Sequence, residues 1–150
     1  MYTKGNILYF KPFYFPDGGS AKNKYFIVLD NDDEDTLIAS LPTSQDHIPS
    51  SIEKKHGCID KPDINFNCYF FEAHRSITEN TWGFPLNTYL YGPQVAKFNR
   101  RNFESIYTLE DFDYEFVGRL IESEFNAIIN CIKNSKSVSR KIRKLLGAKI

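Results

Sequence analysis

Several features are scarce in this 150-residue chain, and each absence narrows what the protein can be. No apolar run approaches the roughly 20 residues that a membrane helix needs, and the segment after Met1 lacks the pattern of a secretory leader. The 19 Lys and Arg residues balance the 19 Asp and Glu residues, which argues against a wholly basic nucleic-acid coat and against a disordered chain. We therefore expect a folded cytoplasmic protein with no membrane segment.

Cysteine is also scarce. Cys58, Cys68 and Cys131 are an odd number with no CxxC pair, so we expect reduced thiols. Four potential zinc ligands lie in the middle of the chain: His56, Cys58, Cys68 and His74. Their spacing matches no known zinc finger or ribbon, and we expect neither a metal site nor a cofactor.

Aromatic residues, in contrast, are abundant, with 13 Phe and 9 Tyr, and they favour half-buried strands. Apolar runs of strand length cover residues 7–15, 25–29 and 36–41, the first interrupted by Lys11 and Pro12. A flexible Gly/Ser loop joins the first two runs and an acidic turn over 31–35 joins the last two. These short connections predict an antiparallel meander.

The middle of the chain is less regular. Residues 46–63 show no clear periodicity and predict a long loop, which in a compact domain is usually functional or mobile. Residues 64–72 alternate with the period of a strand, and residues 73–83 are mostly polar and predict another loop. Two further strands are predicted over 84–91 and 104–107.

The C-terminal part has helical periodicity. Thr108 is the expected N-cap of an amphipathic helix that runs to about Lys133, and Ser137 is the expected cap of a second helix over 138–146. From Lys133 to the last residue there are seven Lys and Arg and no acidic residue. Such a basic tail either follows a phosphate backbone or is a solvated helix end beside an acidic first helix.

Five pieces of the chain follow one another in a distinctive order: Gly5–Tyr9, Gly18–Ser20, Lys24–Leu29, Pro42–Gln45 and Glu115–Leu120. They are a strand after a glycine, a flexible loop, a strand opened by a basic residue, a strand end with Thr-Ser, and a closing helix. In this order they resemble the MazF/PemK-type toxin family of small bacterial endoribonucleases. The likeness covers the first 45 residues well, the helix loosely and the middle poorly.

The resemblance implies an SH3-like antiparallel β-barrel with C-terminal helices. Residues 1–108 would form the barrel and residues 109–150 a helical segment packed on it, in a single domain. It also implies a metal-independent endoribonuclease that cleaves single-stranded RNA, forms a homodimer, and is neutralised by an antitoxin protein in its groove. The chain departs from the family by having Lys24 and Tyr25 where Arg-Pro is usual, and lysine lacks the planar fork of arginine. A second arginine of some members has no clear counterpart, although Tyr91 lies near the expected place.

The chemistry needs a cation for the phosphorane charge and groups that move protons. Lys24 is the candidate cation, Thr43 and Ser44 are candidates to hold a phosphate oxygen, and His47 titrates near neutrality and is a candidate acid or base. Candidate RNA-binding residues are Gly18, Gly19, Ser20, Lys22, Arg75 and Tyr91. Each candidate also has an ordinary structural interpretation: Lys24 as a surface lysine, Thr43 and Ser44 as turn residues, and His47 as a loop histidine.

Two other functions stay open. One is a non-catalytic SH3-like module that binds nucleic acid or protein through the same concave face, having lost the catalytic arginine. The other is a structural barrel whose helical tail is the working part.

Overall fold

The computed structural model describes residues 1–32 and 35–150, so part of the predicted acidic turn over 31–35 lies outside the described residues. The strands are β1 (Asn6–Phe13), β2 (Lys22–Asn31), β3 (Thr36–Ser40), β4 (Gly57–Lys61), β5 (Phe66–Phe71), β6 (Thr88–Tyr91), β7 (Ala96–Asn99) and β8 (Tyr114–Arg119). The helices are α1 (Arg100–Ile106), α2 (Glu122–Lys133) and α3 (Arg140–Leu145), with short 3-10 turns η1 (Pro62–Ile64) and η2 (Gly92–Gln94).

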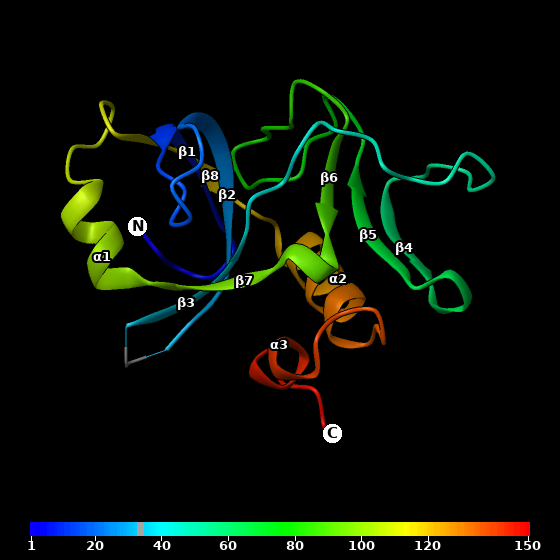
Figure 1. Cartoon of the computed structure of the whole chain (residues 1–150). Coiled ribbons are helices and arrows are strands. Elements are labelled where there is room, and N and C mark those ends of the chain that lie inside the picture. The colour runs from blue at the N-terminus through cyan, green and yellow to red at the C-terminus, as the bar shows by residue number, and fades with distance from the viewer. Residues whose placement is uncertain (33–34) are drawn as a thin grey trace.

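The larger sheet contains five strands in the order β7-β3-β2-β1-β8, and every neighbouring pair is antiparallel (Figure 1). The predicted meander of β1, β2 and β3 is confirmed. β2 is apolar on consecutive residues because it is covered on both sides, with Ile27 facing one core and Phe26 facing another. The paired residues Ile7 and Ile27 fix its register against β1.

The smaller sheet contains β4, β5 and β6 in that order. The strands predicted over 64–72 and 84–91 correspond to β5 and β6, although β6 is shorter. β4 falls inside the segment predicted as a loop over 46–63, so that prediction is wrong for its last residues. Only Ile59 of β4 is buried, because β4 is an edge strand, and it therefore carries little of the apolar signal on which the sequence prediction depends.

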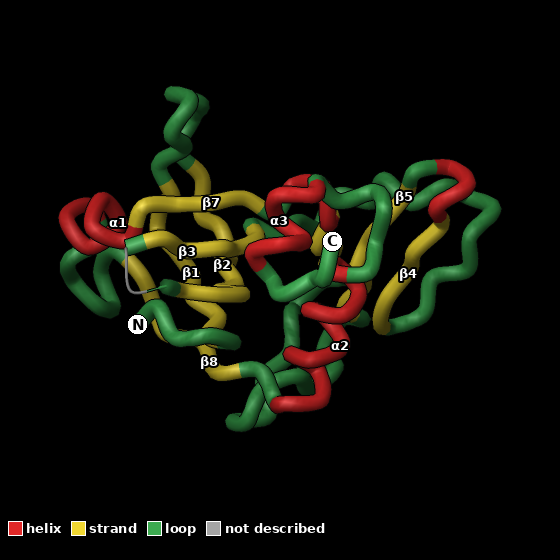
Figure 2. Tube along the Cα trace, turned by 90° about the horizontal axis from the view of Figure 1, so that it is seen from below, coloured by secondary structure: helices red, strands yellow, loops and turns green. Residues whose placement is uncertain are grey.

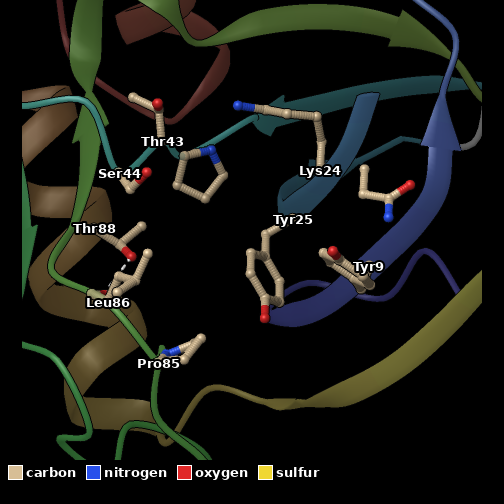
Figure 3. Close-up of a pocket in the computed structure, with 10 residues that line it drawn as sticks. Tyr9, Lys24, Tyr25, Thr43, Ser44, Pro85, Leu86 and Thr88 are labelled. Atoms are coloured by element: carbon tan, nitrogen blue, oxygen red, sulfur yellow. Dashed lines mark hydrogen bonds between the residues drawn. The ribbon is translucent and has the colours of Figure 1, made fainter. Parts of the chain in front are cut away.

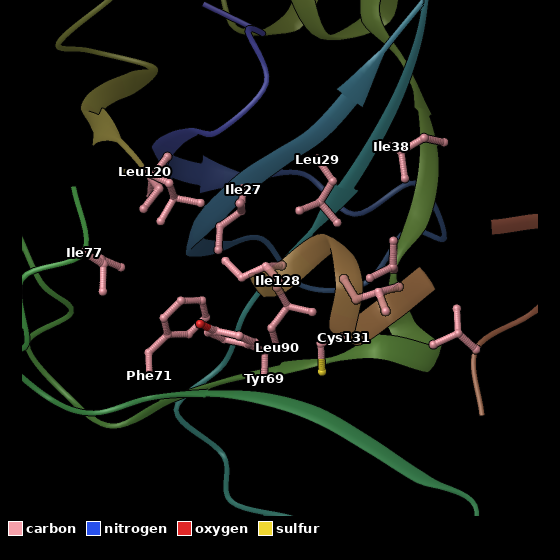
Figure 4. Close-up of a cluster of buried hydrophobic side chains, with 14 of the residues drawn as sticks. Ile27, Leu29, Ile38, Tyr69, Phe71, Ile77, Leu90, Leu120, Ile128 and Cys131 are labelled. Atoms are coloured by element: carbon pink, nitrogen blue, oxygen red, sulfur yellow. The ribbon is translucent and has the colours of Figure 1, made fainter. Parts of the chain in front are cut away.

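Helix α2 packs where the two sheets meet, and its buried side chains complete the core between them (Figure 4). Ile128 and Ile132 are fully buried there. Ile27 and Leu29 come from the larger sheet, and the smaller sheet contributes Tyr69, Phe71 and Leu90. The amphipathic helix predicted to end at about Lys133 is confirmed over this part of the chain.

Helix α1 covers the opposite face of the larger sheet, on the far side from α2 (Figures 1 and 2). Its Phe103 packs against Phe10 and Phe26 in an aromatic cluster. Asn99 caps the helix, since its side-chain oxygen accepts a hydrogen bond of 3.0 Å from the backbone N–H of Asn102. The strand predicted over 104–107 is therefore wrong, because α1 occupies most of this segment.

The helix predicted from Thr108 is wrong up to residue 121. Residues Tyr114–Arg119 form β8, which pairs with β1, so residues 109–150 are not wholly helical. The spacing of Phe112 and Phe116 imitates a helix, but both side chains are exposed. The second predicted helix is present as α3, with Ser139 rather than Ser137 as its cap. Among the described residues, no helix has the length and apolar character needed to cross a bilayer.

The described strands form two open sheets rather than one closed barrel. Isolated antiparallel bridges supplement the pairing within the sheets. Thr43 pairs with Tyr89 of β6, and Thr78 pairs with Leu120. The architecture is therefore a mixed, mostly antiparallel β fold with helices on it.

The cysteines also differ from the prediction. Cys58 on β4 and Cys131 on α2 form a disulfide, so the expectation of reduced thiols is wrong for this pair. The two residues are separated by 73 positions and meet only because α2 packs on the smaller sheet. Cys68 is a free, buried thiol, and burial raises its pKa to about 12.

Replacing Ile128 by alanine tests the role of α2. Because this side chain is fully buried between the two sheets, we expect Ile128→Ala to lower the free energy of unfolding by about 2 to 5 kcal/mol. Ile106→Ala removes the same atoms from a side chain that is 46% exposed, and it is the matched control. Urea denaturation measures both, and equal losses in the two variants would contradict this account of the core.

Candidate functional site

A hollow of about 180 Å³ lies between the start of β2 and the segments that precede β6 (Figure 3). We call it the Lys24 hollow. It is lined by Tyr9, Asn23, Lys24, Tyr25, Pro42, Thr43, Ser44, Pro85, Leu86 and Thr88. Three residues singled out from the sequence, Lys24, Thr43 and Ser44, therefore face one cavity.

The backbone bridge between Thr43 and Tyr89 builds one side of this hollow. The N–H of Thr43 donates to the carbonyl of Tyr89 over 3.0 Å, and the N–H of Tyr89 donates to the carbonyl of Thr43 over 2.7 Å. The chain leaving β3 is thereby held against β6, with Pro42 buried beside it. This geometry carries the two hydroxyl side chains across to the side of the hollow opposite β2.

Lys24 supplies the positive charge of the hollow. Its side chain extends from β2 toward Thr43 and Ser44, which project from the opposite segment (Figure 3). It is half-buried, and it has no ion pair or hydrogen bond with any residue that the structure describes. Burial lowers the pKa of its ammonium group, and the nearby charge of Lys22 lowers it further. An anion that entered the hollow could therefore form an ion pair with the ammonium group of Lys24.

Aromatic rings form another wall. Tyr9 and Tyr25 are cross-strand partners on β1 and β2, and their ring centroids are 4.6 Å apart. Behind them, Tyr25 packs against Phe84 at 5.1 Å and Trp82 at 5.5 Å. Burial raises the pKa of the Tyr25 hydroxyl, with smaller contributions from Tyr9 and Glu115, so this hydroxyl is neutral near pH 7. Rigid, partly exposed rings of this kind are suitable for stacking against an unpaired base.

A second hollow of about 350 Å³ adjoins the first, and the two share Lys24 and Thr43. We call the two together the groove. The second hollow is lined by Phe15, Lys22, Lys24, Leu41, Thr43, Gln45, His47, Tyr91 and Gln94. Lys24 and Thr43 thus lie at the junction of two cavities, where a ligand that filled both would pass.

Tyr91 holds the segment that carries His47. Its hydroxyl donates to the carbonyl of Gln45 over 2.7 Å and accepts from the N–H of His47, also over 2.7 Å. The His47 ring is exposed and lies 5.6 Å from the Tyr91 ring. Burial raises the pKa of the Tyr91 hydroxyl to about 12, so this hydroxyl stays neutral. Its role is to support the segment, not to act as an acid. His47 is therefore the titratable group that reaches this part of the groove from the loop.

The remaining candidates lie elsewhere. Gly18, Gly19 and Ser20 belong to the exposed loop between β1 and β2 and line neither hollow. Gly18 has a φ of +83°, a conformation that glycine adopts without strain. Arg75 follows β5, lines neither hollow, and lies 3.8 Å from the carboxylate of Glu72.

Sequence reasoning missed the walls of the groove. The sequence predicts strands at Tyr9, Tyr25 and Leu86, and none of the three is among its candidate site residues, yet each lines the Lys24 hollow. The pairing of Tyr9 with Tyr25 follows from the register of a β1–β2 hairpin, so a register argument was the available signal. No comparable signal exists for Leu86, because a long-range contact between two loops places it there.

A separate buried network surrounds His56. Its Nδ1 accepts from the N–H of Glu72 over 3.1 Å, so the proton of the neutral ring is on Nε2 and is donated to Glu124 over 2.5 Å. Tyr69 donates to the same Glu124 oxygen over 2.9 Å. Burial raises the pKa of Glu124, but the hydrogen bonds from His56 and Tyr69 lower it by more, and the net shift is downward. The network joins α2 to β5 and to the loop before β4.

His56 and Cys58 are two of the four potential zinc ligands named from the sequence. Cys58 is bonded to Cys131 and His56 to Glu124, so neither is available as the arrangement stands. Within residues 1–32 and 35–150, no group of three or more His, Cys, Asp or Glu side chains is placed to hold a metal ion.

Replacing Glu124 by glutamine tests the network. A carboxylate whose pKa is lowered by folding stabilises the protein above its ordinary pKa, and this stabilisation is lost as the pH falls through the lowered value. We expect Glu124→Gln to cost about 1 to 3 kcal/mol near neutral pH, since it weakens two hydrogen bonds to a buried charge. We also expect it to flatten the loss of stability below pH 4.5.

Thermal unfolding from pH 7 to pH 3 measures this difference. Glu122→Gln is the matched control because Glu122 is exposed on the same helix. If the two variants have the same pH profile, then the carboxylate of Glu124 does not stabilise the fold in the way described.

The groove combines hydroxyl groups, aromatic rings and a cation that has no acidic partner in the described part of the chain, all around two joined cavities. This set of groups is suited to a phosphate with a base or sugar on either side. No acidic residue and no histidine lines the Lys24 hollow itself, and His47 reaches only the adjoining one. In comparisons of the whole sequence, no protein-family model and no curated protein matches it.

Proposed function

We propose that the groove binds single-stranded RNA and that the chain is a metal-independent endoribonuclease of the MazF/PemK toxin type. The observation that carries this proposal is the position of Lys24. It is a half-buried cation without an acidic partner among the described residues, and it lies where two cavities meet beside Thr43 and Ser44. A phosphodiester placed there satisfies the lysine and leaves one cavity for each neighbouring nucleotide.

The proposed reaction is an internal transfer within the RNA. The 2′-oxygen attacks the phosphorus, the bond from phosphorus to the 5′-oxygen breaks, and a 2′,3′-cyclic phosphate and a free 5′-hydroxyl result. Lys24 offsets the negative charge that develops on the phosphorane, and the hydroxyls of Thr43 and Ser44 donate to its oxygens. From the adjoining cavity, His47 either takes the 2′-hydroxyl proton while water protonates the leaving 5′-oxygen, or it protonates the 5′-oxygen while water takes the 2′-hydroxyl proton.

The walls account for a preference for unpaired nucleotides. Tyr9 and Tyr25 offer rings for stacking on one side of the phosphate, and Leu86 closes the same hollow with an apolar surface. A base within a duplex is stacked and paired and does not reach these rings, so single strands are favoured. Lys22 adds a second positive charge along the path into the adjoining hollow.

The finer fold and the partners belong to the same proposal. The five-stranded sheet and the Thr43–Tyr89 bridge support an SH3-like arrangement in which the smaller sheet leans against the larger one. The protein acts in the cytoplasm as a homodimer, and a separate antitoxin protein neutralises it by occupying the groove. Disulfides are rare in the cytosol, so the Cys58–Cys131 bond counts against that location.

A second candidate is a non-catalytic module that binds nucleic acid or protein through the same groove. It is favoured by the absence of any Asp, Glu or His among the residues that line the Lys24 hollow. It is also favoured by lysine at the position where the family has arginine, because lysine gives a point charge in place of a bidentate fork. In this function the RNA would be held without any change in its length.

The double variant Lys24→Ala with Thr43→Ala tests the first proposal. We expect it to slow cleavage of a single-stranded RNA by at least about 100-fold, because it removes the cation and one donor at the phosphate. Cleavage by the unchanged protein is expected to persist in EDTA and to leave a cyclic phosphate. Induced expression is expected to arrest growth for the unchanged protein and not for the double variant.

Lys97→Ala with Thr108→Ala is the matched control, since both residues are exposed and lie outside the groove. The endoribonuclease proposal fails if the unchanged protein neither cleaves single-stranded RNA nor arrests growth. RNA that is bound with its length intact would establish the non-catalytic module instead.

A further inference from the structure

The C-terminal part of the chain forms a second positively charged surface. From residue 125 to residue 150 the chain contains Lys133, Lys136, Arg140, Lys141, Arg143, Lys144 and Lys149 and no acidic side chain. Because the whole chain is neutral, the preceding residues carry a net charge of −7. We call these seven residues the C-terminal basic surface. Helix α3 lies beside α2, and the end of the chain follows α3 (Figures 1 and 2).

The basic surface differs from the rest of the molecule in how its charges are paired. Among the described residues, seven cations before position 125 form ion pairs with carboxylates: Lys4, Lys11, Lys54, Lys55, Arg75, Arg100 and Arg101. None of the seven in the C-terminal basic surface has an ion pair with any residue that the structure describes. The positive charge at this end of the protein is therefore not neutralised internally.

Three of these cations surround one hollow. It has a volume of about 400 Å³ and is lined by Lys133, Asn134, Arg143, Gly147, Ala148, Lys149 and Ile150. The chain turns back after α3, where Gly147 has a φ of +98° and the N–H of Ala148 donates to the carbonyl of Arg143 over 2.9 Å. Arg143 is itself anchored, because its Nε donates to the carbonyl of Val138 over 3.1 Å.

Compensation of helix dipoles explains only part of this arrangement. Lys133 lies in the last turn of α2 and Arg143 in the last turn of α3, where cations are favourable. It does not explain Lys149, which lies beyond α3 and is brought to the same hollow by the turn at Gly147. It also does not explain why none of the described residues that line this hollow is Asp or Glu.

We propose that the C-terminal basic surface binds the phosphate backbone of single-stranded nucleic acid, with Lys133, Arg143 and Lys149 around one phosphate. No aromatic residue lies between 126 and 150, so this contact reads charge and not bases. The surface shares no lining residue with the groove. It is a second binding site, which adds affinity for the nucleic acid and does not require that the nucleic acid be cleaved. The choice of a single-stranded ligand rests on the proposed function.

The test uses the variant Lys133→Gln with Lys149→Gln, because neither side chain makes a hydrogen bond or an ion pair with another described residue. The probe is a labelled 2′-O-methyl RNA of about 20 nucleotides, which a reaction through the 2′-hydroxyl does not cleave, with a DNA of the same sequence as the second arm. Fluorescence anisotropy over a range of salt concentrations gives the affinity. We expect binding about 10- to 100-fold weaker at about 50 mM salt, and a salt slope smaller by about 0.7, because the substituted lysines neutralise one phosphate.

Lys61→Gln with Lys97→Gln is the matched control, since both are exposed and it removes the same charge. Adding Lys24→Ala and Thr43→Ala to each protein separates the two sites. A C-terminal effect that persists in this background, on RNA and DNA alike, supports the inference even if the unchanged protein cleaves nothing. Equal losses in the variant and its control, no binding by the unchanged protein, or tighter binding to anionic lipid vesicles than to either probe overturns it.

Discussion

The packing of α2 into the angle between the two sheets is the constraint on which the candidate site depends. The sheets share a core completed by Ile128 and Ile132, while few backbone hydrogen bonds connect them directly. Lys24 belongs to one sheet, and the segment of Thr43 and Ser44 is held against the other. The groove is therefore set by the angle between two packed layers, which a close-packed interior keeps rigid.

The sequence predicts the centre of the larger sheet well because both faces of β1, β2 and β3 are buried, so their apolar runs are unambiguous. The prediction from the sequence fails at strands on the edges of the two sheets. β4 is an edge strand with one buried apolar residue, and β8 exposes Phe116, which with Phe112 has the spacing of a helix. At such positions the backbone partner decides the structure, and no local pattern records that partner.

The candidate site, like the fold, is predictable from the sequence only in part. The convergence of Lys24 with Thr43 and Ser44 could be inferred because strand order and a family-like sequence of pieces place them together. The aromatic wall and the pairing of Cys58 with Cys131 depend on contacts between distant segments, which spacing alone does not reveal. Gly18 is a candidate because it belongs to the flexible loop of the family-like pieces, and Arg75 because of its charge, but neither lines the groove.

Electrostatics connects the two proposed sites. A half-buried ammonium such as that of Lys24 loses part of its hydration on folding, and a nearby carboxylate would ordinarily offset that cost. The chain has enough acidic residues to do so, and it pairs most of its other N-terminal cations, yet it leaves this lysine and the whole C-terminal basic surface without acidic partners among the described residues. The protein therefore has two separate positive regions although its total charge is zero. Clustered like charges and a half-buried ammonium both cost free energy in the free protein. A bound phosphate would offset that cost at either site, so anion binding is the physical role that the two proposals share.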